Sequence, residues 1–376
     1  MDRVASLDRL FGDNYDPEKT ILISGYDLDV NNEPLKLSDK YYQVYWTVVK
    51  EPAELCIRHN ELVEAKVYIP RDTIQDVVIY SPGYGGDGVC GENLYVDVLE
   101  SSGRAFVFLR HNHLRIESDD PEIDRVLRSC VHCEQKRKWA KENGQIYLGP
   151  SDGSLGYDIT CFREVEIPLD AIATNNDKIN FHLIGHSWGG RICLISLYSL
   201  FLRREQPFYA SLNSRIKTLI VLAPWWETRE EVFRSYIPLI QKDISDGYFR
   251  GMAEKDFLFG LSTTSSWLLK IGRLWWRPPK QTRIAVINSI GDEHTKGWDG
   301  IFQEVAPIYA KLSSCRDTKI DFIPLPDLSP ILPSQFAERN AESHDYCLSL
   351  IWEGIRDIID GNYSSEKFLK RVYAYF

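Results

Sequence analysis

Compact apolar runs alternate with longer segments of helical periodicity along most of this chain. Runs rich in β-branched and aromatic residues predict strands, and segments with apolar residues three and four positions apart predict helices. The expected strands cover residues 41–49, 64–69, 104–109, 179–185, 217–223, 283–291 and 319–325, with a further apolar run that starts at 76 and meets a glycine-rich loop ending at 88. The expected helices cover residues 89–103, 158–174, 188–205, 299–312 and 345–360.

This alternation predicts an α/β fold with a mostly parallel central sheet and helices on both faces. The first two strands suggest an antiparallel opening. Residues 1–40 are polar and irregular and are expected to form an N-terminal extension, and residues 224–281 are too long and too aromatic for a simple connection, which predicts an inserted aromatic-rich helical cap or lid. The predicted core therefore comprises residues 41–223 and 282–376, with an insertion at about 111–157.

The composition is that of an ordinary globular protein. Hydrophobic residues make up 44% of the 376 positions and charged residues 26%. No stretch reaches the roughly eighteen apolar residues of a membrane helix, so we expect no membrane insertion. The net charge of −10 argues against a nucleic-acid partner. The first residues do not resemble a secretory signal and the eight cysteines suggest reduced thiols, so we expect a cytoplasmic protein; nothing points to a particular oligomeric state.

A candidate nucleophile lies in the segment HLIGHSWGGRIC. Residues 185–189 read Gly-His-Ser-Trp-Gly and fit the pattern G-x-S-x-G, between a predicted strand and a predicted helix. A serine at such a turn is forced into an unfavourable backbone conformation, and the flanking glycines prevent clashes with the strand and helix. The expected result is an exposed Oγ of Ser187 at a helix N-terminus, where developing negative charge is favoured. The alternative is a tight turn with an incidental serine.

A serine hydroxyl needs a base, and the base needs an orienting acid. Asp292 directly follows the strand 283–291, and His344 precedes the last predicted helix, which gives the chain order serine, acid, histidine. We therefore expect Ser187, Asp292 and His344 to form a catalytic triad. Open alternatives are His294 for the base and Glu293 or Glu227 for the acid.

With these residues the chain resembles members of the α/β-hydrolase superfamily, nearest in its GHSWGG segment to lipases and esterases. The resemblance covers most of residues 60–360, and it implies an oxyanion hole with two backbone N–H donors. One is the N–H of Trp188, after the nucleophile. The other is the N–H of Tyr84 in SPGYGG, where family members commonly carry His-Gly and this chain carries Pro82-Gly83. A plain glycine-rich turn is the alternative there.

Histidines and tryptophans near the predicted site are candidates for substrate binding. His111 and His113 end the strand 104–109, where ligands of parallel sheets bind, and His186 lies inside the motif. His111 and His113, together with Cys130, His132 and Cys133, offer zinc-ligand chemistry, but no recognised spacing completes a site, so no metal is expected. Trp225 and Trp226 open the aromatic segment, which lines an apolar substrate tunnel, forms the cap's own core or provides a dimer surface.

These residues predict a serine hydrolase that cleaves a small-molecule ester or thioester with a bulky apolar or aromatic group through an acyl-enzyme. No cofactor is required. An acyltransferase using the same acyl-enzyme, and a lyase or ligand-binding protein on the same fold, are the alternatives.

Overall fold

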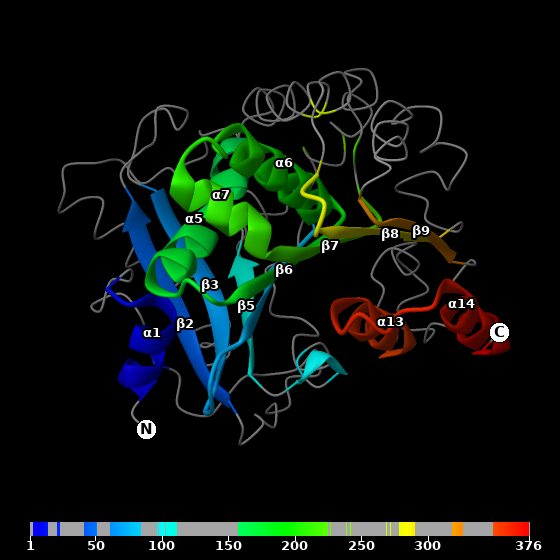
Figure 1. The fold of residues 1–376 in the computed structure, drawn as a ribbon, viewed down its shortest axis with the longest axis horizontal. Coiled ribbons are helices and arrows are strands. Elements are labelled where there is room, and N and C mark those ends of the chain that lie inside the picture. The colour runs from blue at the N-terminus through cyan, green and yellow to red at the C-terminus, as the bar shows by residue number, and fades with distance from the viewer. Residues whose placement is uncertain are drawn as a thin grey trace.

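The core of the chain is one large sheet. The computed structural model describes residues 3–13, 21–22, 41–50, 61–83, 96, 98–101, 103–110, 157–224, 226, 238, 241, 268, 271, 278–289, 318–325 and 349–375. Within these residues a nine-stranded sheet has the order β1-β2-β3-β5-β4-β6-β7-β8-β9 (Figure 1). The strands are β1 Ile21–Leu22, β2 Tyr41–Lys50, β3 Glu61–Pro70, β4 Asp76–Ser81, β5 Arg104–Arg110, β6 Asn180–His186, β7 Ile216–Leu222, β8 Arg283–Ser289 and β9 Ile320–Leu325.

Strand directions follow the prediction. β1, β2, β3 and β5 pair antiparallel in that order, and every pair from β5 through β4 and β6 to β9 is parallel. The antiparallel opening and the mostly parallel sheet are both confirmed. The parallel strands are apolar on both faces because both faces are covered by helices.

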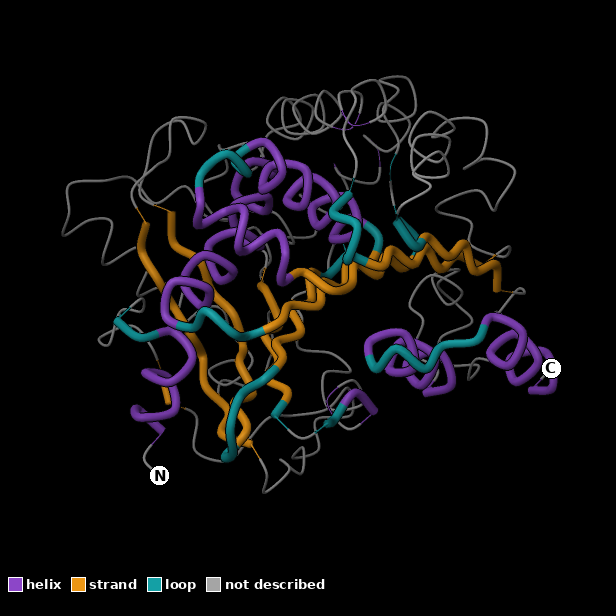
Figure 2. Tube along the Cα trace, viewed as in Figure 1, coloured by secondary structure: helices purple, strands orange, loops and turns teal. Residues whose placement is uncertain are grey.

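Helices cover the two faces of the sheet (Figure 2). They are α1 Arg3–Phe11, α5 Tyr157–Asn175, α6 Trp188–Leu202, α7 Pro207–Arg215, α13 Ser349–Ile359 and α14 Ser365–Tyr375. Alternate residues of β4 separate the layers: Val77 and Ile79 pack in the cluster that contains α1, α5 and α6, whereas Val78 and Tyr80 pack in the cluster that contains α13 and α14. The predicted fold class is therefore confirmed.

The N-terminal segment differs from its prediction. Residues 3–11 were expected to be irregular, but they form α1, whose Leu7, Leu10 and Phe11 are almost completely buried in the core. The amide groups of Asn175 and Asn176 donate hydrogen bonds to carbonyls at the end of this helix. Among the described residues, α7 and α14 are further helices that the sequence patterns did not predict.

Two predicted regions lie largely outside the described residues. These are the insertion at about 111–157 and the helix at 299–312. In the predicted cap the structure describes residues 224, 226, 238, 241, 268, 271 and 278–281. Of these, Trp226, Leu268 and Ile271 belong to the same buried cluster as α6. The division into core and cap stays a prediction. None of the helices in the described ranges has the length and apolarity needed to cross a membrane.

The order of the strands creates one position suited to a ligand. The connection from β4 to β5 passes the face of α13, because Val96 and Leu99 belong to that cluster. The connection from β6 to β7 contains α6 and α7, which pack on the opposite face. Since β4 and β6 are neighbours, their following loops diverge at the carboxyl ends of the strands, which is where open parallel sheets commonly bind their ligands.

Candidate active site

Ser187 occupies a strained turn at this end of the sheet. It lies between the last residue of β6, His186, and the first residue of α6, Trp188, with φ 51° and ψ −111°. Apart from glycines, Ser187 and Ala223 are the described residues with positive φ. Such a conformation costs on the order of 1–3 kcal/mol and persists because the surroundings hold it. Here the Ser187 N–H donates to the Leu222 carbonyl at 2.7 Å and extends the pairing of β6 with β7.

Glycines make this turn possible through contacts between main chains. A Cβ on Gly185 would lie 2.4 Å from the Gly189 carbonyl oxygen, and a Cβ on Gly189 would lie 2.0 Å from the Ser81 carbonyl oxygen. Neither obstacle can rotate away, because both are backbone atoms. The first turn of α6 therefore packs directly on the ends of β4 and β6, which is the physical reason for both glycines of the motif.

The side chain of Ser187 does not serve the helix that it precedes. A serine before a helix normally accepts a hydrogen bond from an N–H of the first turn. Ser187 makes no such bond within the described chain, and its positive φ directs the residue away from the capping geometry. The residue as a whole is 8% exposed. The exposure of Oγ itself stays a prediction.

The predicted oxyanion loop approaches the serine. A Cβ on Gly83 would lie 3.2 Å from Cβ of Ser187 and 3.1 Å from Nδ1 of His186, so the loop after β4 runs directly beside the nucleophile. Tyr84, the predicted donor, follows Gly83 and lies outside the described residues. The N–H of Trp188 belongs to the first turn of α6, where the helix dipole favours negative charge. His186 is half-buried at this position, close to Gly83.

The remaining predicted residues divide into two groups. Trp226 is 1% exposed and packs in the core, and its indole Nε1–H donates to the Gly190 carbonyl at 3.4 Å. Its substrate contact, like that of His186, stays a prediction. The other predicted or alternative site residues lie outside the described part of the chain: Tyr84, His111, His113, Trp225, Glu227, Asp292, Glu293, His294 and His344.

Within the described residues, neither a reactive thiol nor a cluster of metal ligands lies near Ser187. Cys193, on α6, is fully buried, and burial raises the pKa of its thiol far above the ordinary value, so it is a neutral core side chain. In the described ranges, no three histidine, cysteine or acidic residues come together as metal ligands. The histidines and cysteines of 111–133 lie outside those ranges.

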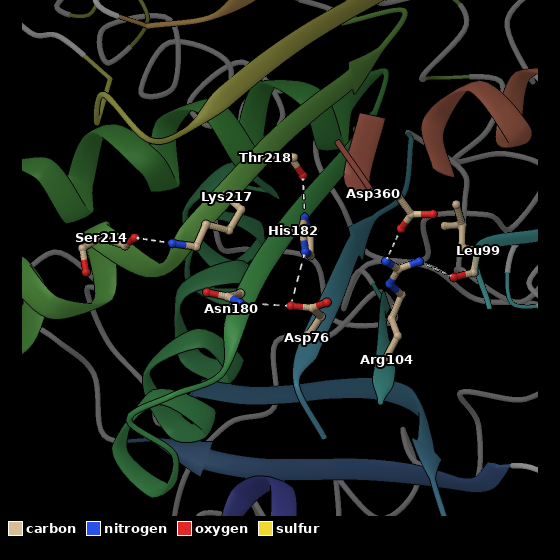
Figure 3. A network of polar contacts seen from close by, with 9 residues as sticks. All are labelled: Asp76, Leu99, Arg104, Asn180, His182, Ser214, Lys217, Thr218 and Asp360. Atoms are coloured by element: carbon tan, nitrogen blue, oxygen red, sulfur yellow. Dashed lines mark hydrogen bonds and ion pairs between the residues drawn. The ribbon is translucent and has the colours of Figure 1, made fainter. Parts of the chain in front are cut away.

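A group of an acid, a histidine and a hydroxyl lies near the amino-terminal ends of the parallel strands, away from Ser187 (Figure 3). The sequence patterns did not predict it. Nδ1 of His182 lies 3.0 Å from Oγ1 of Thr218, and Nε2 lies 3.8 Å from Oδ1 of Asp76. His182 and Thr218 are each 3% exposed, so no substrate reaches them. These residues join the amino-terminal halves of β4, β6 and β7, which gives the group a structural role.

Burial sets the charge of this group. It lowers the pKa of His182 below the ordinary value of 6.5, although the Asp76 carboxylate acts in the other direction. Burial alone would raise the pKa of Asp76, but His182, the Asn180 amide and Arg104 together hold it below its ordinary value of 3.8. The folded protein therefore contains a neutral His182 beside an ionised Asp76. With its proton on Nε2, the ring accepts from Thr218 and directs an N–H toward Asp76.

This group predicts a loss of stability in mild acid. Because the pKa of His182 is lower in the folded protein than in the unfolded chain, protonation favours unfolding as the pH falls below 6.5. Asp76 acts in the same direction below 3.8. We expect the free energy of unfolding to decrease between about pH 7.5 and about pH 5.5, with one proton contributing at most about 1.4 kcal/mol per pH unit.

Urea denaturation at several pH values measures this decrease. His182→Gln, which cannot take up the proton, is expected to show a shallower pH dependence and a lower stability at neutral pH. Asn180→Ala is the matched control, because it removes a neighbour of Asp76 that does not titrate, at 3.2 Å. Equal slopes for wild type and His182→Gln would contradict the prediction.

The strand order, the parallel sheet covered on both faces and the strained serine between β6 and α6 together define an α/β-hydrolase fold. The sequence matches no protein-family model and no curated protein. The chain is similar to solved structures that include a thermostable carboxyl esterase from Bacillus coagulans, with 12% identity over 84% of this chain and 98% of that chain and a TM-score of 0.47. A putative hydrolase from Agrobacterium vitis S4 has 13% identity over 86% of this chain and 99% of its own, with a TM-score of 0.47. Carboxyl esterase 2 from Tuber melanosporum has 14% identity over 89% and 90%, with a TM-score of 0.43.

Proposed function

We propose that this protein is a serine hydrolase that cleaves a carboxylic ester or thioester through an acyl-enzyme. One observation carries the proposal. Ser187 is held in a costly backbone conformation at the carboxyl ends of β4 and β6, and its hydroxyl is not used to cap α6. A strained residue whose hydroxyl does not cap the helix that follows it is the arrangement expected of a nucleophile.

In the proposed reaction Oγ of Ser187 attacks the substrate carbonyl. His344 takes the serine proton and returns it to the leaving alcohol or thiol, and Asp292 holds the imidazole in the required orientation. The N–H groups of Trp188 and Tyr84 stabilise the oxyanion. Water, activated in turn by His344, releases the acid and restores the serine. No cofactor takes part in these steps.

The path of α13 supports His344 as the base. Trp352, in the first turn of α13, packs on Tyr80 near the end of β4, with a distance of 6.1 Å between ring centroids. Asp360, directly after α13, pairs with Arg104 at the start of β5, with an N–O distance of 2.7 Å. α13 thus runs from the carboxyl-terminal ends of the parallel strands toward their amino-terminal ends. The chain enters α13 at the end of the sheet that carries Ser187, five residues after His344.

The position of β8 supports Asp292 as the acid. β8 ends at Ser289, three residues before Asp292, and its carboxyl end lies at the same edge of the sheet as Ser187. β6 and β8 are separated by β7, so their axes are about 10 Å apart. An imidazole that bonds both a serine and a carboxylate bridges a separation of this order.

The proposal that the substrate carries a bulky apolar group rests on the aromatic residues of 224–281 alone.

Labelling with a fluorophosphonate probe tests the proposal. The folded protein is expected to form a covalent adduct that mass spectrometry locates at Ser187. His344→Ala is expected to lower the labelling rate by about a hundredfold or more, since the base is lost, and His294→Ala is the matched control that keeps the rate. Absence of labelling in folded protein would remove Ser187 as the nucleophile. Loss in His294→Ala alone would transfer the role of base to that residue.

A further inference from the structure

The third glycine of the GHSWGG segment, Gly190, has a role outside the G-x-S-x-G pattern. A Cβ on Gly190 would lie 3.2 Å from Cβ of Pro224 and 3.3 Å from the Gly185 carbonyl oxygen. The first turn of α6 is therefore confined on a further side, by the segment that follows β7. This contact brings Pro224 beside the turn that carries the candidate nucleophile.

The segment after β7 is itself held in an unusual conformation. Ala223 has φ 43°, although the residue is not glycine and precedes a proline, and its N–H donates to the Ile287 carbonyl of β8 at 2.8 Å. The N–H of Trp226 then donates to the Pro224 carbonyl at 3.1 Å, which closes a tight turn. The described residues Ala223, Pro224 and Trp226 thus lie on a sharp turn, and Pro224 and Trp226 both contact Gly190 in the first turn of α6.

The side chain of Trp226 completes the contact. Its indole Nε1–H donates to the Gly190 carbonyl at 3.4 Å, and the Gly190 N–H donates to the Ser187 carbonyl at 3.1 Å. Trp226 is 1% exposed, so this bond is shielded from water. A continuous chain of hydrogen bonds therefore joins the Trp226 indole to the backbone of Ser187 through one residue.

We propose that Trp226 is a positioning residue for the nucleophile. It holds the Gly190 carbonyl, and through Gly190 it fixes the backbone of Ser187 and the adjacent N–H of Trp188, which have to be aligned with the substrate carbonyl. This role rests on the proposed hydrolase function. It differs from a substrate-contacting role, because Trp226 acts on the serine through the main chain of α6.

Trp226→Phe tests the role, since phenylalanine keeps an aromatic ring in the core and removes the donor. The expected result is a decrease of roughly threefold to tenfold in kcat for p-nitrophenyl acetate and in the rate of fluorophosphonate labelling, the effect of one lost hydrogen bond, with KM within about twofold of wild type. Ile195→Val is the matched control. It removes one methyl group from the buried face of the same helix, away from Gly190, and is expected to keep kcat.

Gly190→Ala approaches the same contact from the other side, because the added Cβ presses on Pro224. It is also expected to lower kcat, and in the double variant Trp226→Phe with Gly190→Ala the two decreases are expected to be less than multiplicative, since both act on one contact. Unchanged kcat in Trp226→Phe, or multiplicative decreases, would overturn the positioning role. A higher KM with unchanged kcat would also overturn it and assign Trp226 to the substrate site. If wild type itself is not labelled, the proposed hydrolase function fails first.

Discussion

Ser187→Ala is expected to lower kcat for p-nitrophenyl esters by about 10⁴-fold or more while the protein stays folded. The alanine removes the attacking oxygen, and the remaining activity comes from whatever stabilisation the backbone donors give to attack by water. The fold is expected to survive, because the Ser187 hydroxyl does not cap α6. Steady-state kinetics, with circular dichroism and thermal unfolding in parallel, measure the two parts of this prediction.

Ser196→Ala is a matched control for Ser187→Ala. Ser196 lies on the same helix, is fully buried and donates to the Ile192 carbonyl at 2.9 Å, so its loss tests the effect of removing a serine hydroxyl from α6. The control is expected to keep kcat within about twofold of wild type, because it leaves intact the nucleophile elbow, the turn of residues 185–189 that carries Ser187. A Ser187→Ala protein that retains substantial activity would show that another group carries the nucleophile.

Gly189→Ala is expected to destabilise the protein more than the same replacement at Gly185 or Gly190. The new Cβ would lie 2.0 Å from the Ser81 carbonyl oxygen and 2.6 Å from that of Pro82, so α6 would have to move away from the end of β4. Overpacking against side chains commonly costs about 1–3 kcal/mol, and backbone obstacles relax less. We expect a loss of about 3 kcal/mol or more in the free energy of unfolding, or failure to fold, together with loss of labelling at Ser187.

Gly361→Ala separates steric clash from backbone strain. Gly361 has φ 76°, but a Cβ there would meet nothing within 4 Å, so its replacement costs the conformational penalty alone, about 1 kcal/mol. Urea denaturation of both variants gives the comparison. Equal losses in Gly189→Ala and Gly361→Ala would mean that the contact between α6 and β4 can relax, and the account of the elbow would be wrong.

The sheet and the serine turn could be predicted because each leaves a local signal. The strands are continuous apolar runs, as burial on both faces requires, and Gly185 with Gly189 marks a close approach of main chains. α1 was missed although Leu7, Leu10 and Phe11 follow helical spacing, because the pattern is short and charged residues interrupt it. The spacing of these three residues was the signal that could have found it.

Contacts between residues of different strands, far apart in the sequence, could not be predicted in the same way. His182 and Thr218 each appear as one polar residue in an apolar strand, and a register brings them together only once the strands pair. The same holds for Trp226. Its aromatic character fits a substrate tunnel and a core equally well, and the distinction depends on its contact with Gly190.

The glycine contacts of the elbow have an evolutionary consequence. The close approaches of Gly185 and Gly189 are made by main-chain atoms, and none of them involves the side chain at position 187. A mutation at 187 can therefore silence or exchange the chemistry in one step while the fold survives. A mutation at either glycine removes stability and chemistry together. In a lineage that loses the serine, selection for stability still retains the two glycines. A sequence without the serine can therefore still be recognised as a descendant of this fold by its glycines.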